Sequence, residues 1–70
     1  MLNELIKMCK AYISEYAKSN GNSEFYYMGK VHVLLNVIYM YVVETGYKDA
    51  KQYETINREW EEAFQKKVFK

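Results

Sequence analysis

The chain has 70 residues, one cysteine, one histidine and no proline, and its formal net charge at pH 7 is +1. A single cysteine excludes a disulfide within one chain, and a balanced charge argues against nucleic acid or an anionic membrane as the main partner. A chain of this length buries only about 60% of its unfolded surface, so its core needs further stabilisation from disulfides, a metal or oligomerisation. With one cysteine and one histidine, oligomerisation is the remaining source of stability.

The first apolar stripe predicts a helix over residues 4–18, with Asn3 as its N-cap. Its apolar side chains recur every three or four positions and are Leu2, Leu5, Ile6, Cys9, Tyr12, Ile13 and Tyr16. Because Cys9 lies within this stripe, we expect it to behave as a small buried hydrophobe and not as a reactive thiol. The following residues 19–23, Ser-Asn-Gly-Asn-Ser, favour a loop.

The second predicted helix covers residues 24–44, with Asn22 or Ser23 as its cap, and it is apolar on nearly every side. At 100° per residue its broad stripe contains Tyr27, Met28, Val31, Leu34, Leu35, Ile38, Tyr39, Tyr41 and Val42. A narrower second stripe contains Tyr26, Val33, Val37 and Met40. The apolar run from residue 31 to residue 43 is shorter than the roughly 20 residues of a membrane span, so we expect a buried helix and no membrane association.

The third predicted helix covers residues 50–68. Gly46 has the position of a left-handed C-cap residue for the preceding helix, and Asp49 with Gln52 resembles a capping box. The apolar stripe of this helix is Tyr53, Ile56, Trp60, Ala63, Phe64 and Val68. We expect Trp60 to be a core residue.

Together these patterns predict one all-α domain over residues 1–70, an up-down-up three-helix bundle with helix 24–44 at its centre. The two outer helices can cover the broad stripe of the central helix but not its narrow stripe. We therefore predict a homodimer whose interface comprises Tyr26, Gly29, His32, Val33, Asn36, Val37 and Met40. A glycine permits close approach of another helix, and Gly29 fits this interface, a contact with helix 4–18 of the same chain, or a mild irregularity of the helix.

No pattern of catalytic or ligand-binding residues is present. His32 is the only histidine, and its spacing provides neither a carboxylate nor a nucleophile beside it. The glutamates of helix 50–68 lie off its apolar stripe, and no Glu-x-x-His pair occurs. We therefore expect no enzyme activity, no catalytic residue, no metal and no cofactor.

The Tyr27-x-Gly29-Lys30 entry into the long apolar helix resembles small proteins of bacteria and their phages, which implies a small regulator, adaptor or inhibitor carried by a mobile element. The expected function is thus a non-enzymatic protein-binding module in the cytoplasm, where a single thiol stays reduced. The alternative is nucleic-acid binding through basic and aromatic side chains of helix 4–18, which are Lys7, Lys10, Tyr12, Tyr16 and Lys18.

Overall fold

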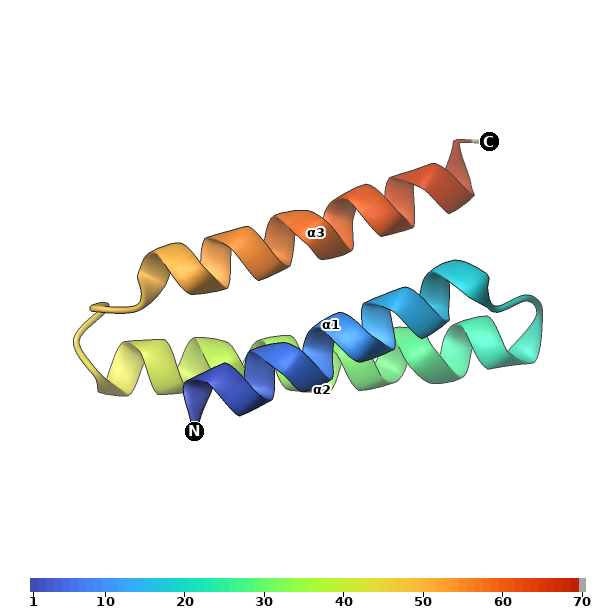
Figure 1. Cartoon of the computed structure of the whole chain (residues 1–70). Coiled ribbons are helices and arrows are strands. Elements are labelled where there is room, and N and C mark those ends of the chain that lie inside the picture. The colour runs from blue at the N-terminus through green and yellow to red at the C-terminus, as the bar shows by residue number, and fades with distance from the viewer. Residues whose placement is uncertain (70) are drawn as a thin grey trace.

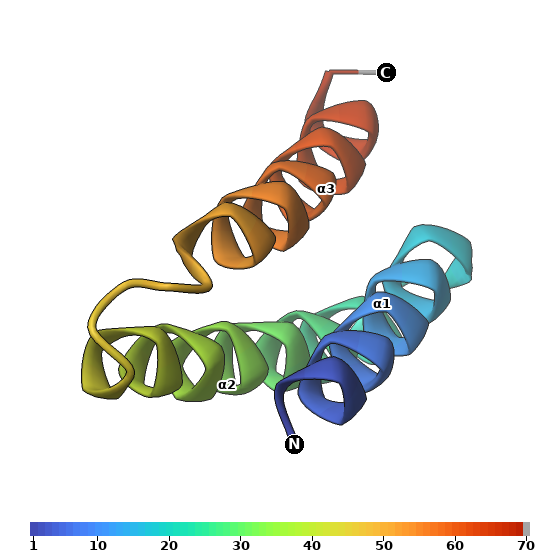
Figure 2. The ribbon, with the colours of Figure 1, turned by 60° about the vertical axis from the view of Figure 1, so that its left-hand side comes forward.

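The computed structural model describes residues 1–69, and it contains three helices packed together. They are α1 (Leu2–Lys18), α2 (Asn22–Glu44) and α3 (Ala50–Val68). No strand occurs within residues 1–69, so the prediction of an all-α protein is confirmed. The molecule is elongated and measures 38 × 19 × 14 Å along its principal axes. Figures 1 and 2 show that the connection from α1 to α2 and the connection from α2 to α3 lie at opposite ends.

The core is built from one apolar stripe of each helix, and the pair α1–α2 has the largest interface. Its buried residues are Leu2, Cys9, Ile13, Tyr16, Val31, Leu34, Leu35, Ile38, Val42, Ile56 and Trp60. Trp60 is only 7% exposed and contacts the ring of Tyr16 edge-on, with 4.7 Å between ring centroids. Its predicted role as the residue that packs α3 onto the other helices is confirmed.

The predicted caps of the first two helices are wrong. α1 begins at Leu2, two residues before the predicted start at residue 4, and the Leu2 side chain is buried in the core. Asn3 therefore lies inside the first turn and is not the N-cap residue. α2 begins at Asn22 after Gly21, whose φ of +65° turns the chain without a side-chain cap. Ser23 is inside α2 and its hydroxyl donates backwards to the carbonyl of Asn20 at 2.9 Å.

The C-terminal end of α2 has the predicted left-handed glycine. The amide of Gly46 donates to the carbonyl of Val43 at 3.1 Å, and that of Tyr47 donates to Val42 at 2.9 Å. These two bonds form a Schellman motif, which satisfies carbonyls that would otherwise lack a partner. Gly46 has φ +73°, and Tyr47 has φ +66°, which is uncommon for a residue with a side chain.

The predicted capping box at the start of α3 does not form. Asp49 is the N-cap residue, but its carboxylate makes no cap hydrogen bond. Side-chain capping requires extended backbone at the N-cap, whereas Asp49 has φ −105° and ψ +20°. Its backbone carbonyl instead accepts from the amide of Gln52 at 3.0 Å.

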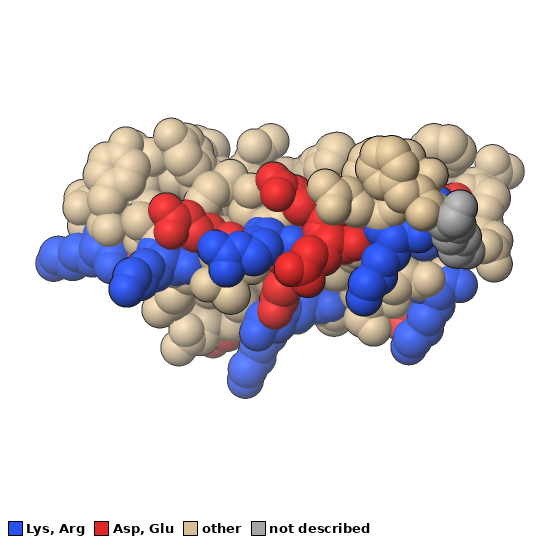
Figure 3. Space-filling view, turned by 90° about the horizontal axis from the view of Figure 1, so that it is seen from above, with Lys and Arg blue, Asp and Glu red and all other residues tan. Residues whose placement is uncertain are grey.

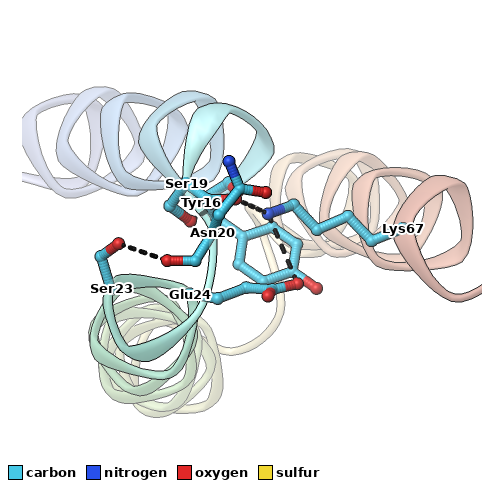
Figure 4. Close-up of polar contacts among 6 residues, drawn as sticks. All are labelled: Tyr16, Ser19, Asn20, Ser23, Glu24 and Lys67. Atoms are coloured by element: carbon cyan, nitrogen blue, oxygen red, sulfur yellow. Dashed lines mark hydrogen bonds and ion pairs between the residues drawn. The ribbon is translucent and has the colours of Figure 1, made fainter.

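A cluster around Lys67 joins the end of α3 to the turn between α1 and α2. Figure 4 shows its ammonium group donating to the backbone carbonyl of Ser19 and lying 3.4 Å from a carboxylate oxygen of Glu24. The same ammonium lies 4.4 Å from the ring centroid of Tyr16. Burial, and secondarily the negative charge of Glu24, raise the pKa of the Tyr16 phenol. We call these four residues the Lys67 cluster.

Candidate protein-interaction surface

The side of α2 that faces away from α1 and α3 carries exposed apolar side chains along most of its length. We call it the outer face of α2, and its apolar residues are Phe25, Tyr26, Val33, Val37, Met40 and Val43. Val33 is 62% exposed and Met40 is 64% exposed, so neither helix of the same chain covers them. Large contiguous apolar patches are rare on monomers and commonly mark an interaction site.

The polar residues of this face are few and uncharged near its middle. Gly29, His32 and Asn36 are exposed beside the apolar residues. A methyl group on Gly29 would meet no atom within 4 Å apart from its chain neighbours and the adjacent backbone of α2. The close contact between Gly29 and α1 that its sequence position also allowed is therefore absent, and Gly29 is exposed on the outer face.

Three residues of α2 differ from the sequence interpretation. Phe25 and Val43 were not assigned to either stripe, although their helical phase puts both of them next to Gly29 and Asn36. Tyr39 was assigned to the buried stripe but is 46% exposed, because it lies at the stripe's edge. Its ring packs against Tyr53 of α3, with 5.4 Å between centroids.

An open hollow between α2 and α3 contains His32. Its lining residues are His32, Leu35, Asn36, Tyr53, Asn57, Trp60 and Glu61. The imidazole packs edge-on against the indole of Trp60, with 5.5 Å between centroids and 90° between planes. Glu61 also lines this hollow, and its carboxylate oxygen accepts a hydrogen bond from the amide of Asn57 at 3.3 Å.

The thiol of Cys9 is fully buried in the α1 stripe. Burial, and secondarily the negative charge of Glu59, raise its pKa to about 11. A thiol is nucleophilic and binds metals as the thiolate, so this environment suppresses both reactions at neutral pH. Among the residues that the structure describes, no three His, Cys, Asp or Glu side chains are placed to hold a metal ion together.

The structure separates the residues expected for nucleic-acid binding. Lys7, Lys10 and Lys18 are exposed on α1, but Tyr16 is only 1% exposed and cannot stack on a base. Tyr12 is half-buried, and its ring lies 6.2 Å from that of Tyr27. Figure 3, seen with α3 toward the viewer, shows acidic and basic side chains mixed in one band, not a basic patch.

Comparisons of this chain with protein-family models, with curated proteins and with solved structures find no match. Within residues 1–69, none of the helices has both the length and the apolar character that crossing a bilayer requires.

Proposed function

We propose that this chain is a small non-enzymatic protein-binding module, a regulator, adaptor or inhibitor in type. In this proposal it is an up-down-up bundle that forms a homodimer through the outer face of α2. The observation that carries the proposal is the row of exposed apolar side chains on that face, from Phe25 to Val43.

The physical argument concerns the cost of leaving this row in water. Each side chain is roughly half exposed, so burying it against a partner contributes on the order of 1 kcal/mol. In a twofold dimer the same surface is buried on both subunits, so every contribution counts twice. The total is comparable to the cost of association, which is roughly 4–15 kcal/mol, so a dimer of moderate affinity is expected.

Other features support a binding role over a chemical one. His32 packs edge-on against Trp60, Glu61 in the same hollow accepts a hydrogen bond from Asn57, and the Cys9 thiol is buried. The burial of Tyr16 removes one of the two aromatic residues that nucleic-acid stacking on α1 would use. A single free thiol suits the reducing cytoplasm.

The test is the substitution Val37→Glu at the middle of the outer face. Val37 is 41% exposed in the single chain, so a glutamate there stays hydrated in a monomer but loses its water in a dimer. Sedimentation equilibrium from about 1 to about 300 µM should give a two-chain mass for the wild type and a one-chain mass for the variant.

The matched control is Val68→Glu, which introduces the same charge in place of an exposed valine on α3. It should leave the two-chain mass unchanged. A wild-type mass of one chain throughout this range would show that the outer face does not bind a second copy. A two-chain mass that survives Val37→Glu would place the interface elsewhere.

A further inference from the structure

The charged residues of the outer face of α2 are Lys30, in the N-terminal half of the helix, and Glu44 at its end, and their signs are opposite. Lys30 lies seven residues before Val37, and Glu44 lies seven residues after it. Seven residues return an α-helix to nearly the same direction, so these three residues form one row with about 10 Å between neighbours. Lys30 and Glu44 are both exposed, and the Lys30 ammonium lies 5.4 Å from the ring centroid of Tyr26.

A second row on this face has the same seven-residue spacing and consists of Tyr26, Val33 and Met40. The two rows alternate at steps of four and three residues along α2. This alternation is the heptad pattern by which two helices pack side chains into each other's gaps. All members of the two rows are exposed in the single chain, so the pattern is available to another helix.

The charges distinguish between the two ways in which a second copy can bind. A parallel pair of α2 helices places Lys30 beside the partner's Lys30 and Glu44 beside the partner's Glu44. An antiparallel pair with its twofold axis near Val37 places each Lys30 beside the partner's Glu44. Unlike charges are thereby brought together at both ends, and like charges are kept about 20 Å apart.

We infer that the outer face of α2 binds the same face of a second copy in antiparallel orientation, with Lys30 of each subunit next to the partner's Glu44. This inference rests on the homodimer proposed above and adds its geometry. The same twofold axis brings Val37 next to its own copy and Val33 near the partner's Met40, so the paired segment from Lys30 to Glu44 is apolar in the middle and charged at both ends. Phe25 and Tyr26 lie beyond the end of the partner's α2 in this arrangement.

Charge exchange tests the orientation. Lys30→Glu and Glu44→Lys each place like charges at both ends of an antiparallel dimer, and each should raise the dissociation constant roughly tenfold. The double variant Lys30→Glu/Glu44→Lys restores both pairs and should bind within roughly threefold of the wild type. The control Lys7→Glu changes the net charge as Lys30→Glu does but lies on α1, and it should have little effect.

The measurement is again sedimentation equilibrium, with circular dichroism to confirm that each variant is folded. Because both residues are exposed in the single chain, the variants should keep their helix content. If the wild type is a dimer but the single variants bind as tightly as Lys7→Glu, or if the double variant fails to recover, the antiparallel geometry is wrong and the homodimer stands. A wild type that is monomeric throughout overturns both.

Discussion

The Lys67 cluster allows a test of what holds α3 in place. The substitution Lys67→Met keeps an apolar stem of similar length on the ring of Tyr16 but removes the ammonium group. The variant thereby loses the hydrogen bond to the Ser19 carbonyl, the ion pair with Glu24 and the cation–π contact. The three contacts connect α3 to the last turn of α1, to Ser19 in the connection that follows, and to the first turn of α2, all more than 40 residues earlier in the chain.

The magnitude follows from the burial of these groups. A hydrogen bond from a charged donor contributes about 1.5–3 kcal/mol. The ion pair contributes at most about 1 kcal/mol, because the Glu24 side chain is 31% exposed, and the cation–π contact contributes about 0.5–2 kcal/mol. One ammonium makes all three contacts and loses its own hydration, so the contributions do not add, and we expect a net loss of about 2 kcal/mol. For a domain of this size that lowers the melting temperature by roughly 10 °C.

The assay is urea unfolding followed by the fluorescence of Trp60, at one fixed protein concentration because association shifts apparent stability. The matched control is Lys66→Met, whose lysine is exposed and which should change stability by less than about 0.5 kcal/mol. Glu24→Gln should cost less than Lys67→Met, since the hydrogen bond to Ser19 remains. Equal stabilities for the Lys67→Met and Lys66→Met variants would refute the reasoning.

Trp60, Cys9 and Gly29 give four more tests. Trp60→Ala should cost about 3–5 kcal/mol, against a total of about 4–10 kcal/mol for such a chain, so thermal melting should show it largely unfolded at 37 °C; an unchanged melting temperature would contradict its burial. Because the pKa of Cys9 is raised from 9.0 to about 11, a disulfide reagent at pH 8 should modify the native protein only as fast as it unfolds. The free energy of unfolding should also fall between pH 9 and pH 11, where the unfolded chain loses the thiol proton first, and urea titrations across that range measure this slope. In the Val37→Glu background, Gly29→Ala should raise the free energy of unfolding by about 1 kcal/mol, since its methyl group meets open space; a loss of stability would show that α1 or α3 reaches Gly29.

The helices and most of their buried faces could be predicted from the sequence, because apolar periodicity reflects burial directly. Ile56 and Trp60 are examples, since their spacing alone placed them on the inner side of α3. The helix starts could not be predicted in the same way. Whether Asp49 caps α3 with its side chain depends on its backbone ψ, and the residue type does not determine ψ.

The side of α2 that carries the candidate surface could be predicted from the sequence, but the full set of its exposed residues could not. Val33 and Met40 were expected on it from their phase, whereas Phe25 and Val43 needed the positions of α1 and α3 to show that nothing covers them. The Lys67 cluster was not predictable at all. Lys67 is more than 40 residues from its three partners, and no periodicity gives the register at which the end of α3 meets the turn between the other two helices.

The turn after α2 has a consequence for how the chain could rearrange. Gly46 adopts its left-handed backbone freely, but the same conformation at Tyr47 costs about 1–2 kcal/mol. A continuous helix over residues 22–68, a rod about 70 Å long, would relieve that strain. The Schellman motif at Gly46 and the docking of α3 through Ile56, Trp60 and Lys67 both oppose that rod. Loosening this docking favours the rod, and two rods could exchange their α3 segments to form a domain-swapped pair.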